Sequence, residues 1–382
     1  MLLAVNKMTA LRILRGLRGS GARLASARTE LPAPDPAPHR RWYAADLPLE
    51  RLFLSEPPSS RHPLNVAVPK KDARIQASFV SCTIYSSGLP EGAFVSLGDG
   101  LLIPSPELLF LELASLMSTA VHVLLGYELC GSFSRDAADP RMGDVAFDVA
   151  PVTSVEKIGS FLDICHGVRG IRAARRSLAY VADNAWSPME AVVATMATLP
   201  VVEFGYELGP MRLNTRYENP AELVALGCRG SRVPDIEVVG TSVGFNYDGR
   251  EHFDLNALEE ASSDQEHRAA ARSLREKYVD DLRRNRELAA QGRVILPVTT
   301  EDLFVESGLD AVMLEAARAI EHFDGTSMDY VSGSIASEPI RKGRQRLVWS
   351  LLPWDAAEGW ARDIIERERP KAMRVIEEYI EF

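Results

Sequence analysis

Residues 233–249, VPDIEVVGTSVGFNYDG, decide the fold of the C-terminal half of the chain. Two short runs rich in β-branched and aromatic residues, 233–239 and 241–246, are joined by a single glycine, which predicts two neighbouring strands. Periodicity predicts three further elements: helix 188–199, helix 265–291 and strand 293–298. Helix, adjacent strands, helix and strand in this order predict an α/β domain rather than an all-β one.

The N-terminal half has a different pattern. Short apolar runs bounded by turn residues predict strands at 64–68, 77–85 and 93–97. Ser105-Pro106-Glu107 has a cap residue, a proline and an acid at the positions that begin a helix, and Ser154 is a second candidate cap. These features predict an α+β domain in this half.

The composition fits a chain of two domains. The length of 382 residues exceeds that of one average domain. The expected organisation is a basic segment and Pro-rich connector at 1–40, an α+β domain at 41–184, an α/β domain with a central mixed sheet at 185–305, and a helical extension at 306–382.

The net charge and the cysteines limit the partners and the cellular compartment that can be expected. A net charge of −10 argues against nucleic acid covering the whole surface, although it allows a local basic groove. The four cysteines form no C-x-x-C pair, so buried free thiols in a reducing, cytoplasmic setting are expected. No apolar run reaches the ~18 residues of a membrane helix, and no membrane partner is expected.

The first 29 residues are basic and contain no acid. Three interpretations remain open: an organelle transit peptide, an amphipathic helix over 8–17 with its charged face in solvent, or a basic arm that binds nucleic acid. The basic residues are Lys7, Arg12, Arg15, Arg18, Arg23 and Arg28.

Acidic residues gather around the two central strands. Asp235 stands at the head of the first strand, and Asp248 follows the second. Divalent-metal hydrolysis of a phosphodiester needs two or three converging carboxylates, and Glu190 on the preceding helix is a third candidate. His252 is a candidate for holding a water or protonating a leaving oxygen.

These segments together resemble the PD-(D/E)XK endonuclease superfamily, in the branch similar to very-short-patch repair endonucleases. The segments that carry the resemblance are Val233-Pro234-Asp235-Ile236, Asn246-Tyr247-Asp248-Gly249-Arg250-Glu251-His252, Asp281-Leu282-Arg283-Arg284-Asn285-Arg286-Glu287-Leu288 and Gly292-Arg293-Val294-Ile295-Leu296-Pro297-Val298. The resemblance covers about a third of the chain. It implies a restriction-endonuclease-like fold, Mg²⁺-dependent cleavage of DNA, Asp235 as a metal ligand and Glu190 as a helix acid. Asp281 and Arg284 would brace the fold.

One position departs from the family pattern, which has Glu where this chain has Asn246. An amide oxygen carries no charge and coordinates Mg²⁺ more weakly than a carboxylate does. Residues i and i+2 of a strand share a face, so Asp248 could replace the missing acid, and Glu237 shares a face with Asp235. Two hypotheses follow: an attenuated nuclease, or a degenerate nuclease fold that binds nucleic acid or a protein partner.

The N-terminal half resembles, less specifically, bacterial abortive-infection antitoxin regulators. The residues concerned are Ser105-Pro106-Glu107, Phe110-Leu111-Glu112-Leu113-Ala114 and Gly126-Tyr127-Glu128-Leu129-Cys130-Gly131. The resemblance implies an adaptor or DNA-facing module in a bacterial defence or mobile-element context. Tyr127, Glu128 and Cys130 themselves are expected to pack and cap rather than to form a site. A third hypothesis is a structural component of a larger complex.

Overall fold

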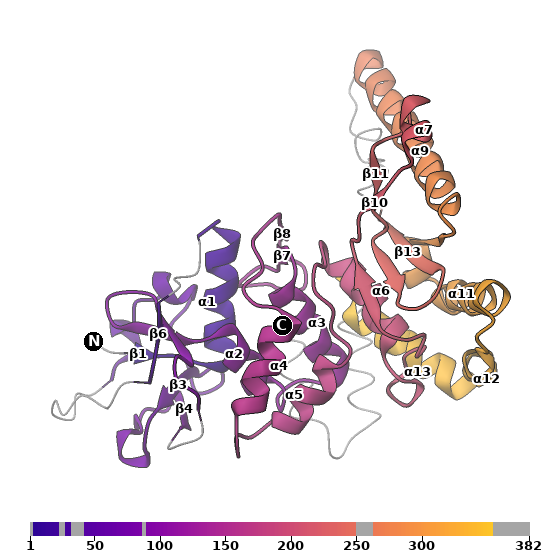
Figure 1. The fold of residues 1–382 in the computed structure, drawn as a ribbon. Helices are drawn as coiled ribbons and strands as arrows, with labels where there is room; N and C mark the ends of the chain where they lie inside the picture. The colour runs from indigo at the N-terminus through magenta and orange to yellow at the C-terminus, as the bar shows by residue number, and fades with distance from the viewer. Residues whose placement is uncertain (1–2, 23–26, 32–41, 86–88, 250–262, 354–382) are drawn as a thin grey trace. The chain divides into compact units, whose positions relative to one another are not determined.

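The computed structural model describes residues 3–22, 27–31, 42–85, 89–249 and 263–353 (Figure 1). The chain divides into two compact units, one comprising Met1–Pro188 and Pro353–Phe382 and the other Met189–Leu352. Within the described residues, no helix is long and apolar enough to cross a membrane. Each unit contains helices and a mixed four-stranded sheet, which confirms the predicted α/β class.

The first unit contains a four-stranded sheet in the order β1-β6-β5-β2. Its strands are β1 (Leu3–Ala4), β6 (Leu101–Pro104), β5 (Phe94–Ser96) and β2 (Arg28–Thr29). The β1–β6 pair is parallel and the other two pairs are antiparallel. Two strand pairs complete the unit: β3 (Leu64–Val68) with β4 (Val80–Ile84), and β7 (Phe133–Ser134) with β8 (Ala146–Phe147).

Five α-helices are described in this unit. They are α1 (Lys7–Gly19), α2 (Pro106–Leu113), α3 (Thr119–Cys130), α4 (Val155–Ile164) and α5 (Ile171–Leu178). The two predicted caps are confirmed, because the Ser105 side chain accepts from the Leu108 amide and the Ser154 side chain from the Lys157 amide. Both caps satisfy amides that the first helical turn leaves without a partner.

Helix α1 is part of the core of the first unit rather than a solvated appendage. Arg15 and Arg18 are buried at 6% and 5% exposure. Arg15 donates to both carboxylate oxygens of Glu128, at 2.9 and 2.7 Å, and Arg18 donates to the carbonyl oxygens of Glu128 and Gly131. The expectation of a charged face in solvent is therefore wrong for these two arginines, because their partners lie inside the fold. It also follows that residues 3–19 are not a separate segment.

The α3 residues Tyr127, Glu128 and Cys130 are buried, as the expectation that they pack requires. Tyr127 is fully buried and its hydroxyl donates to the Tyr180 carbonyl oxygen. Cys130 and Cys165 are buried free thiols, whereas Cys82 and Cys228 are partly exposed.

The second unit is built on a four-stranded mixed sheet in the order β14-β13-β12-β9. The strands are β14 (Val294–Thr299), β13 (Val243–Asp248), β12 (Ile236–Val238) and β9 (Met211–Leu213). Strands β9, β12 and β13 are antiparallel neighbours, and β14 runs parallel to β13. The parallel pair needs a crossover, which the long helix α9 (Asp264–Ala289) lies within.

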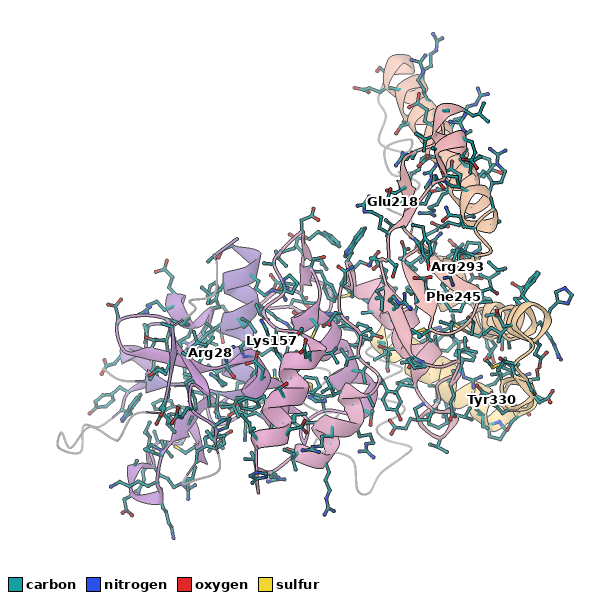
Figure 2. All side chains as sticks on the ribbon, in the orientation of Figure 1. Arg28, Lys157, Glu218, Phe245, Arg293 and Tyr330 are labelled. Carbon is teal, nitrogen blue, oxygen red and sulfur yellow. The ribbon has the colours of Figure 1, made fainter. Side chains whose placement is uncertain are left out.

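The two faces of this sheet differ in polarity. Leu213, Ile236 and Phe245 pair across one face and are almost completely buried; Phe245 is labelled in Figure 2. Helix α11 (Gly308–Asp324) contacts β13 and β14. Because side chains alternate along a strand, Asp235 and Asn246 fall on the opposite face, across from each other. The site residues therefore stand on the polar face.

The remaining helices of the second unit are α6 (Pro188–Thr198), α7 (Ala221–Ala225), α10 (Thr300–Phe304), α12 (Asp329–Ala336) and α13 (Glu338–Leu351). Arg344 of α13 is 1% exposed, donates to Asp310 of α11 at 2.6 Å and to the Gly205 carbonyl oxygen at 3.0 Å, and so joins three segments. Residues 306–352 were expected to form a separate extension, but this buried ion pair makes them part of the second compact unit. The predicted helical segment 356–382 lies outside the described residues.

Residues 200–232 contain β9 and an antiparallel hairpin. The hairpin strands are β10 (Tyr217–Glu218) and β11 (Ser231–Arg232), and β11 contacts α9 (Figure 1).

Candidate carboxylate site

Asp235 and Asn246 hold the start of β12 and the end of β13 together. The Asp235 amide donates to Asn246 Oδ1 at 3.0 Å, and the Tyr247 amide donates to Asp235 Oδ2 at 2.7 Å. Asn246 is 1% exposed. Its amide oxygen is thus used to fix the backbone of Asp235, a task for which an uncharged acceptor is sufficient.

Two further carboxylates act on Asp235 electrostatically. Burial and the negative charge of Glu190 raise the pKa of Asp235 to about 7, with a smaller upward contribution from Asp248. The Tyr247 amide and Arg284 oppose this rise but do not outweigh it. The three carboxylates come from α6, from the start of β12 and from the end of β13. A carboxyl whose pKa is raised by burial and like charge is typical of functional sites.

Each auxiliary carboxylate has its own partner. Glu190 is buried and accepts from Asn214 Nδ2 at 2.9 Å. Asp248 Oδ1 lies 3.6 Å from the Arg284 guanidinium, which is also 3.4 Å from Asp281 of the same helix. Arg284 therefore links α9 to the end of β13 and places one positive charge beside the carboxylates.

Glu237 lies on the same strand face but is engaged elsewhere. Its carboxylate accepts from the Tyr217 hydroxyl and lies 3.7 Å from Arg293, which is labelled in Figure 2. The charges that act on Asp235 come from Glu190, Arg284 and Asp248. The structure thus groups Glu237 with β10 and Arg293 instead of with the other three acids.

His252 lies outside the described residues. Within the part of the chain that is described, no group of three or more His, Cys, Asp or Glu residues is placed to hold a metal ion. The hard oxygen donors that Mg²⁺ prefers are nevertheless present in Glu190, Asp235 and Asp248.

Sequence reasoning missed the contribution of β9. Asn214, which follows β9, supports Glu190 through its side chain and donates its amide to the Asp235 carbonyl oxygen at 2.9 Å. The alternation of Met211, Arg212, Leu213 and Asn214 was the signal available for this strand. The pairing of Arg284 with Asp248 had no signal, because the two residues are 36 positions apart.

No family model matches the sequence. No curated protein and no solved structure matches it either.

Proposed function

We propose that the second unit is a metal-dependent endonuclease-like domain acting on DNA, with activity attenuated at Asn246. The observation that carries the proposal is the raised pKa of Asp235, which burial and the charges of Glu190 and Asp248 bring to about 7, so that carboxylates from three different elements influence one another at the start of β12. The order α6, β12, β13, α9 and β14 is the order of helix, adjacent strands, helix and strand that the sequence pattern predicts.

Glu190, Asp235 and Asp248 supply the kind of carboxylate oxygen that a hard divalent cation prefers, although no three such acids of the described chain are already placed around one point. Mg²⁺ held there would supply Lewis acidity and lower the pKa of a bound water. Asp235 and Asp248 would hold the cation, and Glu190 would assist as a third carboxylate. Arg284 orients Asp248 and offsets part of the negative charge. Asn246 holds the Asp235 backbone in place and is a positioning residue.

A binding function without cleavage is the second candidate, for instance in an antitoxin-like regulatory protein. It is favoured by one observation, the neutral Asn246 at the family's acid position with its oxygen bound to the Asp235 amide. The α2 and α3 residues that carry the antitoxin resemblance are almost all buried, so they support a fold rather than a contact surface.

Cleavage assays separate the two candidates. Supercoiled plasmid and a mismatched duplex are incubated with Mg²⁺ or Mn²⁺, and nicked and linear products are measured. We expect slow cleavage that Asp235→Asn abolishes and that Asn246→Glu accelerates, because the latter restores a carboxylate. Glu315→Gln, an exposed acid of α11, is the matched control and should cleave as the wild type does. Cleavage that survives in Asp235→Asn, or no cleavage in either metal, would rule out the nuclease proposal.

A further inference from the structure

A groove of about 790 Å³ lies between α9 and the segment that runs from α7 to β11. Its charged lining consists of six arginines and three acids, a local formal charge of +3 in a chain whose net charge is −10. The arginines are Arg229, Arg232, Arg272, Arg275, Arg283 and Arg286, and the acids are Glu276, Asp280 and Glu287.

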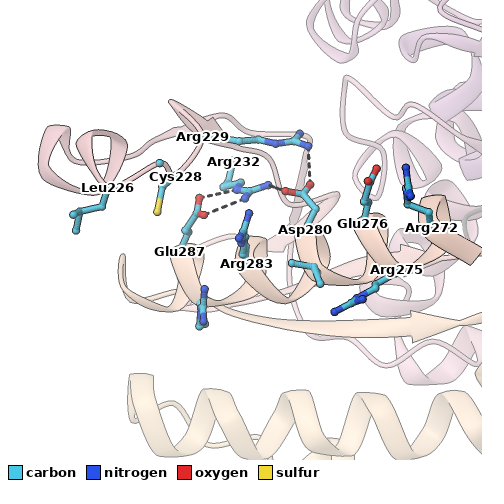
Figure 3. A pocket seen from close by; sticks show the side chains of 13 residues that line it. Leu226, Cys228, Arg229, Arg232, Arg272, Arg275, Glu276, Asp280, Arg283 and Glu287 are labelled. Atoms are coloured by element: carbon cyan, nitrogen blue, oxygen red, sulfur yellow. Dashed lines mark hydrogen bonds and ion pairs between the residues drawn. The ribbon is translucent and has the colours of Figure 1, made fainter.

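The floor of the groove is an ion-pair network (Figure 3). Arg232 is 4% exposed and binds both carboxylate oxygens of Glu287, at 2.7 and 3.0 Å. It also shares Asp280 with Arg229, at 3.0 and 2.9 Å. This network neutralises two of the three acids, so only Glu276 opposes the remaining arginines.

The remaining four arginines form a stripe along α9. They are Arg272, Arg275, Arg283 and Arg286, all exposed and without a hydrogen-bonded or ion-paired partner among the described residues. With Val279 they recur at intervals of three or four residues, which places them on one helix face. Fourteen residues of helix span about 21 Å.

Two short stretches of the chain lead from residues that line the groove to residues of the carboxylate site. Arg232 lies three residues before Asp235 in the chain. Arg284, which contacts Asp248, is flanked by Arg283 of the stripe. The C-terminal end of the stripe therefore lies on the part of α9 that contacts the end of β13.

We infer that the α9 stripe of Arg272, Arg275, Arg283 and Arg286 binds the phosphodiester backbone of a nucleic acid and guides it to the carboxylate site. The choice of nucleic acid over an acidic polypeptide rests on the proposed function. Guanidinium groups match phosphate oxygens in geometry and charge. A stripe of about 21 Å corresponds to roughly six steps of 3.4 Å along one DNA strand. The contacts are to the backbone and carry no base specificity.

The test is the salt dependence of binding, measured by fluorescence anisotropy in EDTA with a labelled 20-base-pair duplex and a 20-nucleotide single strand. Four phosphate contacts predict a log–log slope of about −3.6 for the duplex and about −2.8 for the single strand. Arg272→Gln/Arg275→Gln should reduce the duplex slope by about 2, and so should Arg283→Gln/Arg286→Gln. Glutamine is a good helix former, so these exposed substitutions leave α9 intact.

Arg172→Gln/Arg176→Gln is the matched control. It removes two exposed arginines from helix α5 and should leave affinity and slope unchanged. Equal losses in the control and the groove variants, or no loss in the groove variants, would overturn the inference. So would competition by polyglutamate at charge concentrations equal to those of DNA, since the occupant would then be an acidic polypeptide. Binding in EDTA is independent of cleavage. Stripe-dependent binding without nuclease activity would therefore refute the proposed function and still support nucleic-acid binding by the stripe.

Discussion

Asp235→Asn is expected to stabilise the second unit at neutral pH while abolishing the proposed cleavage. The folded-state pKa of Asp235 is raised to about 7 by burial and by Glu190, whereas the ordinary value is 3.8. Between these values the unfolded chain releases a proton that the folded protein retains. Wild-type stability therefore falls as pH rises from about 4 to about 7 and is level above that.

The magnitude follows from the size of the shift. A rise of about three pKa units corresponds to about 4 kcal/mol. Asp235 is partly exposed, and screening by solvent reduces this figure to about 2 kcal/mol. Asparagine keeps an oxygen that accepts from the Tyr247 amide, so the variant removes the charge without removing the hydrogen bond.

Urea-dependent hydrogen exchange of peptides that contain β12 and β13 reports on the second unit by itself. In EDTA, Asp235→Asn should exceed the wild type by about 2 kcal/mol at pH 8 and equal it near pH 4. The contributions of the other titrating groups to the free energy of unfolding are the same in both proteins and cancel when the variant is compared with the wild type. Mn²⁺ at ten times its Kd should then stabilise the wild type by about 1.4 kcal/mol and the variant by less. A variant that is destabilised equally at both pH values would refute the reasoning.

Two further predictions concern the buried ion pairs. Burial opposes ionisation of Glu128, but the charge of Arg15 outweighs it and lowers the pKa of Glu128 to about 2. The first unit should therefore lose about 3 kcal/mol as pH falls from about 4.5 to 2, and Glu128→Gln should remove this dependence; an unchanged acid transition by circular dichroism would contradict it. Arg344→Met should cost the second unit about 3–5 kcal/mol in urea unfolding, because it leaves the Asp310 carboxylate buried and unpaired. Adding Asp310→Leu should recover most of this loss, and a double variant as unstable as the single one would contradict the pairing.

Local features of the fold could be predicted from the sequence. The strand at 64–68 and the caps at Ser105 and Ser154 agree with prediction because their signals lie within a few neighbouring residues. The edge strand β9 is three residues long and shows only a short alternation, and β10 and β11 have two residues each, which is too few for a periodic signal. The burial of Arg15 could not be predicted, since charged side chains are buried only when paired and its partner is 113 positions away.

The residues of the candidate carboxylate site could be proposed from the sequence, whereas their contacts could not. Strand alternation predicts that Asn246 shares a face with Asp248 and Asp235 with Glu237, whereas the position of Asn246 opposite Asp235 comes from the register between β12 and β13. Alternation could not show that the Asn246 oxygen is taken by a backbone amide, nor that Glu237 is drawn to Tyr217 and Arg293. The first contact depends on the register between β12 and β13, and the second depends on where the fold brings Tyr217 of β10 and Arg293.

The burial of α1 has a consequence for the order of events during synthesis. Arg15 leaves the ribosome 113 residues before Glu128, which at about 5–20 residues per second is an interval of roughly 6 to 23 s. Until Glu128 emerges, docking α1 would place a guanidinium in the core without its counter-charge, so the helix stays solvated in the nascent chain. Folding of the first unit thus waits for α3, and a ribosome stalled before residue 128 should carry an N-terminal half that proteases still cut at α1.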